Sequence, residues 1–380
     1  MSQGEQSTEQ SGEQSTESGI RLGRVGPVPV YLRPSWFLIA VAMTLLFAPT
    51  VRAWVDVTGA GVYLISFVFA LILLLSVFVH EAAHAVAAAA TGTPATAIVL
   101  DLWGGHTAFD TPSPQPWRAV VVAVVGPLSN VLIAFTAHQF VDAAPHGSVA
   151  RLLLAATATS NLVVAVFNAL PGLPLDGGRV LEGIVWRISG DRLTAAVFAG
   201  HAGRVVAVGT LVYAGFAVLT GEHRPASAFW LVLVGVLLWR AAGQAVEVAR
   251  WNIRADAVLV DDLLQPAVSV PSNATVAGAL MSAAGAGATA VVVLDVYGRP
   301  SAIVDERAAA GVPAARAEEV RAGTVAEALP AGAVLSTGLA GQSLIQALQD
   351  VPTARYAVLG DDDAVIGVLD WEDVARFVAP

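Results

Sequence analysis

The stretch Val77-Phe78-Val79-His80-Glu81-Ala82-Ala83-His84-Ala85-Val86 places a His-Glu-x-x-His pattern inside an apolar run from Gly61 to Ala90. On a helix, His80 and His84 lie one turn apart on the same face and can bind one metal ion, with Glu81 beside them. The run exceeds the roughly 20 residues that a bilayer requires. Each ionisable group in a membrane costs on the order of 3 kcal/mol. The alternative interpretation is a set of buried side chains satisfied by neighbours on their own helix, but the spacing favours metal binding.

The composition indicates an integral membrane protein and limits its chemistry. Of the 380 residues, 56% are hydrophobic and only 13% are charged, an apolar fraction that soluble globular proteins rarely reach. The chain contains no cysteine, which excludes disulfides, cysteine nucleophiles and thiolate metal sites, so a metal would need histidine and carboxylate ligands. The formal net charge is −10, and no basic cluster resembles a nucleic-acid footprint, so no nucleic-acid partner is expected.

Polar and apolar segments divide the first two thirds of the chain. Residues 1–19 are almost all polar or glycine, which predicts a disordered tail, and the tail lacks the apolar core of a secretory signal. Residues 28–33 are apolar and broken by proline, as in an extended or interfacial lead-in. Six apolar segments long enough to span a bilayer follow: about Trp36–Val55, Gly61–Ala90, Trp117–Val141, Val149–Leu170, Ala195–Leu219 and Ser227–Val248. Residues 20–254 are therefore expected to form a six-span membrane domain.

The distribution of arginine indicates the orientation of these segments. If the N-terminus is cytoplasmic, most arginines lie at or near cytoplasmic ends, and only Arg52, Arg151 and Arg224 face outward. This asymmetry follows the positive-inside rule, so both termini are expected in the cytoplasm and the protein in the plasma membrane. The second segment then runs inward, and His80 lies about ten residues, roughly 15 Å, before its inner end. The metal site is therefore expected within the lipid bilayer but nearer the cytoplasm.

The segment Thr96–Asp110 is expected to form two short apolar strands around a Gly104-Gly105 turn. An open strand edge beside the metal site could hold a substrate backbone by strand addition. A re-entrant loop that only seals the site is an equally supported alternative. His106 could contact substrate or be an ordinary loop histidine. None of the remaining histidines has a partner motif, and metal binding is not expected for His138, His146, His201 or His223.

A catalytic zinc site takes three protein ligands and leaves a fourth position for water, so the two histidines need a third ligand at matching depth. The best candidate is Asp176 in Asn168-Ala-Leu-Pro-Gly-Leu-Pro-Leu-Asp176-Gly-Gly-Arg179, at the inner end of the fourth segment. The prolines interrupt the helix and the glycine pair permits a tight turn, so the carboxylate can point back into the bundle. An ordinary turn with an exposed aspartate is the alternative. Asp101 and Asp110 are competing carboxylates in a loop, and Glu182 is expected to face water.

The last third of the chain has a different character, rich in Ala and Val with frequent Asp and Gly and no membrane-length run. A weak internal repeat appears at an offset of 66 residues, from position 290 to position 356. The matching segments are Ala290–Asp295 with Tyr356–Asp361 and Ser301–Val304 with Gly367–Asp370. Helix-like stretches at 275–284 and 341–350 precede the expected strands. We expect one α/β domain over residues 255–380, made of two copies at about 255–322 and 323–380.

Three motifs together carry a family resemblance: His80-Glu81-Ala-Ala-His84 in an apolar helix, Gly126-Pro-Leu-Ser-Asn130, and Asn168-Ala-Leu-Pro-Gly-Leu-Pro-Leu-Asp176-Gly-Gly. They resemble the site-2 protease family of intramembrane zinc metalloproteases. Six spans followed by a repeat pair resemble the bacterial branch that carries cystathionine-β-synthase-type (CBS) domains, over about residues 20–380. The resemblance implies an α-helical polytopic membrane protein with six transmembrane segments and a cytosolic α/β CBS-domain pair.

The resemblance also implies roles for individual residues. One Zn²⁺ ion would be bound by three ligands: His80, His84 and Asp176. Glu81 would act as general base, and Asn130 and Asn168 would position or polarise the substrate peptide. No insertion resembling a PDZ domain is present, so access of the substrate would have to be controlled by another part of the chain.

CBS pairs often bind adenine nucleotides through an aspartate that grips the ribose, and Asp373 fits that position in the second copy. Asp370, however, stands where a hydroxyl residue would face the phosphate, and a carboxylate there is repulsive. In the first copy the equivalent residues are Val304 and Arg307. Nucleotide binding and a purely structural or dimerising role, with a homodimer formed through the CBS domains, therefore both remain open.

The resulting functional hypothesis is a zinc endopeptidase that cleaves transmembrane or membrane-associated segments of regulatory proteins near the cytoplasmic side. Its implied partner is a membrane-tethered transcription regulator or an anti-sigma factor, and the CBS pair could modulate cleavage. A CBS-regulated transporter is one alternative, but it would distribute polar residues along several spans, whereas here they gather near one motif. A non-proteolytic scaffold derived from a protease is the other, although all four core residues are present.

Overall fold

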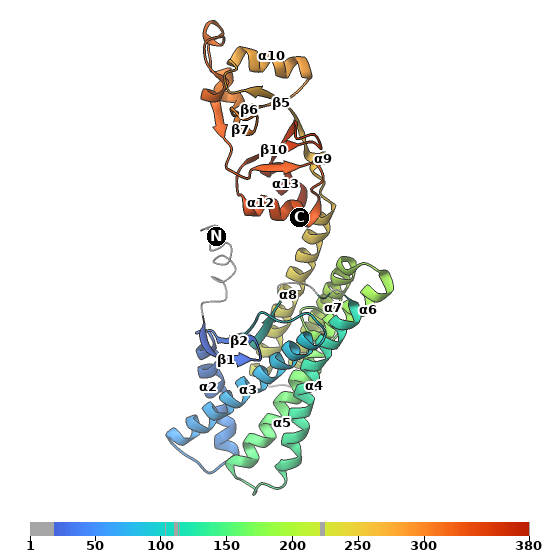
Figure 1. Cartoon of the computed structure of the whole chain (residues 1–380). Coiled ribbons are helices and arrows are strands. Elements are labelled where there is room, and N and C mark those ends of the chain that lie inside the picture. The colour runs from blue at the N-terminus through green and yellow to red at the C-terminus, as the bar shows by residue number, and fades with distance from the viewer. Residues whose placement is uncertain (1–18, 103, 110–112, 114, 221–224, 380) are drawn as a thin grey trace. The chain divides into compact units, whose positions relative to one another are not determined.

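The computed structural model describes residues 19–379 except 103, 110–112, 114 and 221–224. The tail predicted to be disordered therefore lies outside the described residues, apart from Gly19. The chain divides into two compact units, one extending to Val246 and the other beginning at Glu247 (Figure 1). The division falls within a long helix that also contains the boundary expected at residue 254.

Six helices in the first unit and its junction with the second are long and apolar enough to cross a membrane, in agreement with the six predicted segments. They are α2 (Trp36–Trp54), α3 (Ala60–Ala90), α4 (Pro116–Val141), α5 (Val149–Asn168), α7 (Arg192–Thr220) and α8 (Pro225–Ala257). The helices α4 and α5 pack side by side, and α3 packs against α4 (Figure 1). Large apolar side chains such as Leu64, Leu132 and Leu219 point outward, as expected for surfaces that face lipid.

A four-stranded sheet lies against α3 and has the strand order β1-β2-β3-β4. Its strands are β1 (Ile20–Val25), β2 (Val28–Leu32), β3 (Ala97–Asp101) and β4 (Gly104–Ala108). The predicted extended lead-in is β2, which pairs with β1 in antiparallel and with β3 in parallel orientation. The strand pair predicted in 96–110 is confirmed, but Gly104 and Gly105 begin β4 rather than forming the turn. Within the described residues, β4 is an edge strand of this sheet.

A short loop connects α5 to the amphipathic helix α6 (Asp176–Ser189) and sets the position of Asp176. The loop packs directly on α7: the backbone N–H of Leu173 donates to the carbonyl of Ala199 over 3.1 Å. A Cβ added to Gly203 would lie 2.0 Å from the Leu173 carbonyl oxygen, so only glycine permits this approach.

Asp191 lies directly before α7, and a hydrogen bond from the Thr194 hydroxyl lowers the pKa of its carboxyl.

The second unit contains a seven-stranded sheet with the order β8-β7-β6-β5-β11-β10-β9. The strands are β5 (Gln265–Pro271), β6 (Ala290–Leu294), β7 (Pro300–Val304), β8 (Ala326–Ala328), β9 (Val334–Ser336), β10 (Arg355–Leu359) and β11 (Val365–Asp370). The helices are α9 (Val260–Leu263), α10 (Val276–Ala286), α11 (Glu306–Ala310), α12 (Gly341–Asp350) and α13 (Trp371–Val378). The antiparallel pairs β6–β7 and β10–β11 are the strands of the sequence repeat, and each follows a predicted helix, α10 or α12.

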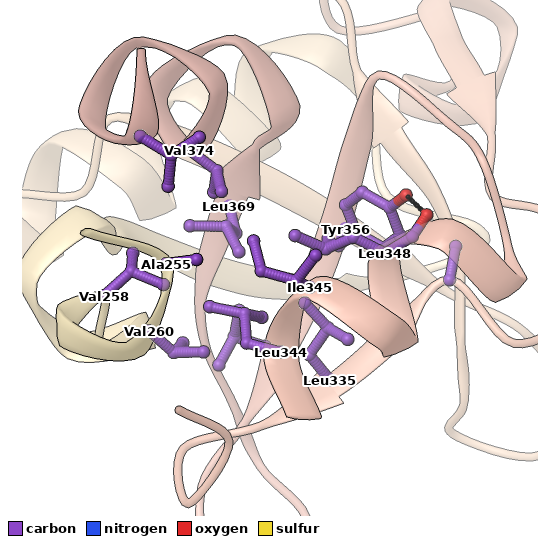
Figure 2. Packing of buried hydrophobic residues seen from close by; sticks show 13 residues of the cluster. Ala255, Val258, Val260, Leu335, Leu344, Ile345, Leu348, Tyr356, Leu369 and Val374 are labelled. Atoms are coloured by element: carbon purple, nitrogen blue, oxygen red, sulfur yellow. Dashed lines mark hydrogen bonds between the residues drawn. The ribbon is translucent and has the colours of Figure 1, made fainter. Parts of the chain in front are cut away.

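Figure 2 shows the largest core of this unit, in which the C-terminal turns of α8 pack against α12, β10 and α13. Leu344, Leu369 and Tyr356 are at most 1% exposed. The Tyr356 hydroxyl is paired within the core, 2.9 Å from the carbonyl oxygen of Leu348 and 2.6 Å from that of Val351. Large apolar side chains thus fill this core, and its polar atoms are satisfied.

Candidate metal centre

Three ligand-type side chains from α3 and α6 converge at one point. The Nε2 atoms of His80 and His84 lie 3.1 Å apart. Asp176 Oδ2 lies 3.1 Å from His80 Nε2, and Asp176 Oδ1 lies 3.4 Å from His84 Nε2. Among the described residues, these three form the one group of histidine and carboxylate side chains close enough to share a metal ion. The sequence-based prediction of these three residues as one set therefore agrees with their positions.

Hydrogen bonds at the opposite side of each ring determine what the two Nε2 atoms can do. His84 Nδ1 lies 2.7 Å from the backbone carbonyl oxygen of Val122 on α4, which can only accept, so Nδ1 carries the proton. His80 Nδ1 lies 2.6 Å from Asn130 Oδ1 and likewise donates. With both protons on Nδ1, each Nε2 presents a lone pair toward the other ring and toward Asp176.

This arrangement fits a bound zinc ion. Two nitrogen lone pairs and a carboxylate face one another without a donor between them, and Asp176 Oδ2 is buried with no hydrogen-bond partner. Tetrahedral ligands at the usual zinc bond lengths lie about 3.3 Å from one another, close to the separations observed here. A cation at the centre would satisfy all three groups, and histidine with carboxylate is a donor set that zinc accepts.

The Glu81 side chain lies beside the centre and is held by the sheet. The Thr107 hydroxyl on β4 is 2.8 Å from Glu81 Oε2 and 3.1 Å from the Glu81 backbone carbonyl oxygen. Gly105, two residues earlier on the same strand, touches the base of this side chain, because a Cβ there would lie 2.9 Å from Glu81 Cγ. The carboxylate is therefore fixed through one oxygen by the edge strand.

Close packing by glycine leaves space for the histidine rings. A Cβ added to Gly126 on α4 would lie 2.3 Å from His84 Nε2 and 2.7 Å from His80 Cε1. The motif Gly126–Asn130 thus contributes to the centre at both ends, with a glycine under the rings and an amide on His80. Neither contact is a ligand interaction.

A cavity of about 820 Å³ opens onto the centre. Its lining includes the edge strand β4, His106, Asn168 and, beyond Asp176 on α6, Arg179 and Glu182. Glu182 was predicted to face water, but its side chain is only 17% exposed and lies 3.5 Å from Arg192, another lining residue. The cavity therefore joins the metal-type ligands, a strand edge and a charged region.

The two asparagines predicted to position substrate have different surroundings. Asn130 is 1% exposed, and its amide is used on both sides, by His80 at Oδ1 and by Asn161 at Nδ2. Asn168, at the end of α5, lines the cavity, and no hydrogen bond involves its side chain among the described residues. Of the competing carboxylates, Asp101 is the last residue of β3 and is not a member of the group formed by His80, His84 and Asp176, and Asp110 lies outside the described residues.

Sequence reasoning missed Thr107, Asn161 and Ser76. Asn161 on α5 donates to Ser76 Oγ on α3 over 3.1 Å, and it accepts from Asn130 over 2.8 Å. The available signal in the sequence was a small polar residue within an apolar segment, as at Ser76 and Asn161. In the structure both side chains are almost fully buried. Without the fold, nothing in the sequence assigns them to His80.

In the second unit, the carboxylates considered for nucleotide contact are already engaged. Asp373 accepts from Gln265 over 3.1 Å and lies 3.2 Å from Arg376. Asp370 accepts from Gln265 and from Arg355, over 2.9 and 3.0 Å. The negative charge of Asp370, noted as repulsive to phosphate, is thus compensated by a neighbouring guanidinium.

Two solved structures resemble parts of the chain. The site-2 protease from Methanocaldococcus jannaschii is 23% identical, with a TM-score of 0.44 over 60% of this chain and 95% of that one. The CBS domain of a CBS-domain-containing membrane protein from Sphaerobacter thermophilus is 16% identical, with a TM-score of 0.28 over 36% of this chain and 96% of that one. CBS domains are thus among the solved structures to which this chain is similar.

Sequence relatives cover the chain more fully. It is 30% identical over 260 residues to a Synechocystis sp. protein whose name assigns it to the zinc metalloproteases, covering 67% of each chain. It is 27% identical over 365 residues to Rip3 of Mycobacterium tuberculosis, which is named in the same way, covering 94% of this chain and 92% of Rip3. The model of peptidase family M50 matches residues 68–146 and 135–212, which contain all three zinc-type ligands. The chain belongs to peptidase family M50, the site-2-protease-like zinc metalloproteases.

Proposed function

We propose that the chain is an intramembrane zinc endopeptidase that cleaves transmembrane or membrane-associated segments of regulatory proteins. The observation that carries this proposal is the convergence of three metal-type ligands, an adjacent carboxylate and a strand edge on one cavity. The arginine distribution favours cytoplasmic termini, so cleavage would occur near the cytoplasmic side of the bilayer. A membrane-tethered transcription regulator or an anti-sigma factor is the class of substrate that the resemblance to site-2 proteases implies.

The chemistry follows from the roles of the side chains. A zinc ion held by His80, His84 and Asp176 would act as a Lewis acid on water and on the peptide carbonyl. Glu81 takes a proton from the attacking water at Oε1, the carboxylate oxygen that Thr107 does not hold, and passes it to the leaving amine. Thr107 keeps this carboxylate in one rotamer, so that little reorganisation is needed at the moment of proton transfer.

The substrate must offer an unwound segment, because a helix hides its carbonyl groups in internal hydrogen bonds. The exposed edge of β4 would pair with such a segment by strand addition. Asn168 lines the same cavity, and because its amide makes no hydrogen bond within the described part of the chain, it is suited to hold a substrate carbonyl. Asn130 is better suited to orient His80 than to reach the substrate, because both ends of its amide are already used.

The decisive experiment compares zinc content and cleavage of single-span substrates in the wild type and in Glu81→Gln. The amide cannot accept the proton, so cleavage should fall by about 10²–10⁴-fold while stoichiometric zinc is retained. Glu247→Gln, an exposed change on α8, is the matched control and should cleave normally. Undiminished cleavage by Glu81→Gln would remove the proposed base.

The same measurements separate the alternative functions. Stoichiometric zinc without cleavage of any substrate would favour a non-proteolytic scaffold. A CBS-regulated transporter predicts solute flux in proteoliposomes that survives Glu81→Gln. The grouping of polar side chains at one centre favours the protease over the transporter, and the presence of all four core residues favours it over the scaffold.

Regulation through the C-terminal pair is the second part of the proposal. An adenine nucleotide would bind with its ribose on Asp373 and its phosphate near Arg355, displacing the present partners Gln265 and Asp370. A structural role, or homodimer formation through this unit, is the alternative. Calorimetry of the full chain in micelles with ATP, ADP and AMP decides between them. No heat at millimolar nucleotide would favour the structural role, and heat that Asp373→Ala removes would favour binding.

A further inference from the structure

A buried chain of side-chain hydrogen bonds connects three helices and ends at the metal centre. It starts at Ser76 on α3, passes through Asn161 on α5 and Asn130 on α4, and returns to α3 at His80. All four side chains are buried, and Asn130 and Asn161 are each only 1% exposed. Ser76 and His80 lie one turn apart on α3, so this series of hydrogen bonds begins and ends on the same helix.

A backbone carbonyl beside Asn161 fixes the direction of each hydrogen bond in this series. Asn161 Nδ2 lies 2.9 Å from the backbone carbonyl oxygen of Thr157, which only accepts, so that end of the amide must be the donor. Ser76 agrees, since its hydroxyl donates to the carbonyl of Ile72 over 3.0 Å and its oxygen is left to accept from Asn161.

The constraint then passes along the chain. Because the NH₂ group of Asn161 already donates to Thr157 and Ser76, its Oδ1 faces Asn130. The NH₂ group of Asn130 must therefore donate to this oxygen, over 2.8 Å. Asn130 is thereby oriented with Oδ1 toward His80, 2.6 Å from Nδ1. An acceptor at this position requires the His80 proton on Nδ1 and leaves the lone pair on Nε2. The reversed Asn130 amide would point a donor at Nδ1 and favour the tautomer that cannot bind metal through Nε2.

We propose that Asn161, supported by Ser76, is a positioning residue of the metal centre that fixes the tautomer of His80 through the direction of the Asn130 amide. This inference rests on the proposed zinc site but assigns residues that lie outside the three motifs. Partners in the second layer around a metal typically change its affinity by 10–100-fold. Asn161 would act at the same scale, although one whole side chain separates it from the ligand.

The test measures zinc affinity of the full chain in detergent by competition with a chelator. Asn161→Leu, which is close in size and can neither donate nor accept, should weaken zinc binding by about 10–100-fold. Ser160→Ala, the neighbouring residue on α5, is the matched control and should bind zinc as the wild type does. Wild-type affinity in Asn161→Leu would overturn the inference and leave the proposed function intact, whereas a wild type without zinc would overturn both.

A suppressor distinguishes positioning from general packing. In Asn130→Asp both side-chain oxygens are acceptors, so residue 130 can accept the hydrogen bond from His80 Nδ1 in either orientation. The double variant Asn130→Asp/Asn161→Leu should therefore recover most of the affinity lost in Asn161→Leu. A double variant as weak as the single one would show that Asn161 acts only through packing and would sink the proposal.

Two further readouts cover the case in which Asn161→Leu does not fold. Asn161→Ala also removes the amide but adds no bulk, and it should weaken zinc binding by about 10–100-fold, with much less effect in the Asn130→Asp background. In zinc-free protein labelled with ¹⁵N-histidine, nuclear magnetic resonance should find His80 protonated at Nδ1 in the wild type and in both tautomers in Asn161→Ala. Unchanged affinity and an unchanged tautomer in Asn161→Ala would contradict the proposal.

Discussion

The two units of this protein bury opposite kinds of side chain. The C-terminal unit encloses leucine, isoleucine and tyrosine, as at Leu344 and Tyr356. The membrane unit turns its large apolar side chains outward and buries alanine along α7, together with polar groups such as Glu81 and Asn161. Water drives the first arrangement, because apolar area is removed from it. Lipid supplies no such drive, so close approach and hydrogen bonds hold the membrane helices.

The difference means that the two interiors should respond to different substitutions. In the C-terminal unit, the expected damage comes from taking apolar atoms away, and the measured loss is stability. In the membrane unit, the expected damage comes from adding atoms or removing a polar group, and the measured losses are those of zinc affinity and catalytic rate. Paired substitutions in the two units can therefore support or refute this contrast.

Leu344→Ala should have the largest effect on stability. Leu344 is fully buried in α12, and such truncations cost about 2–5 kcal/mol because a cavity remains. Urea titration with pulse proteolysis of the full chain would follow the unfolding of the C-terminal unit. Leu280→Ala on α10, where the leucine is 47% exposed, should cost far less, and lipid-facing Leu64→Ala should leave both units stable. Comparable losses at all three leucines would erase the proposed contrast.

Gly126→Ala tests the opposite expectation, that one added methyl group disables the membrane unit. The new Cβ would lie 2.3 Å from His84 Nε2, so the rings or α4 must move at a cost of about 1–3 kcal/mol. Zinc affinity should fall by about 10–100-fold, although alanine favours the helix itself. Gly209→Ala on α7 meets nothing within 4 Å and should change neither zinc affinity nor cleavage. Normal zinc binding by Gly126→Ala would mean that the centre tolerates displacement of its ligands.

The spans and the grouping of His80, His84 and Asp176 were accessible from the sequence, because both depend on local pattern. Length and apolar content define the helices. The four-residue spacing of His80 and His84 places both side chains on one face of a helix, where they can share a metal ion. Asp176 followed from the need for a third ligand at matching depth. Its prolines and glycines are local signals for the loop between α5 and α6.

Contacts between distant segments were not accessible. Thr107 reaches Glu81 across 26 residues of sequence, and Asn161 reaches Ser76 across 85. No local pattern marks either pair. The strand β1 was missed because Arg21, Gly23 and Arg24 interrupt its apolar residues and hide the pairing with β2. Glu182 was expected in water because its partner Arg192 belongs to the next helix.

Thr107→Val should have the smallest effect of the three and tests how far the polar interior of the membrane unit serves chemistry. Valine keeps the shape of threonine but removes the donor to Glu81 Oε2. A hydrogen bond to a charged group contributes at most about 1.5–3 kcal/mol, and only the part that orders the carboxylate for proton transfer is lost from kcat, so kcat should fall by about three- to tenfold. KM and zinc content should not change, because neither the edge of β4 nor the ligands are altered. Thr107→Ser restores the hydroxyl and should recover most of kcat. An increase in KM at constant kcat would instead make Thr107 a substrate contact, and the hydroxyl would then belong to the binding strand rather than to the base.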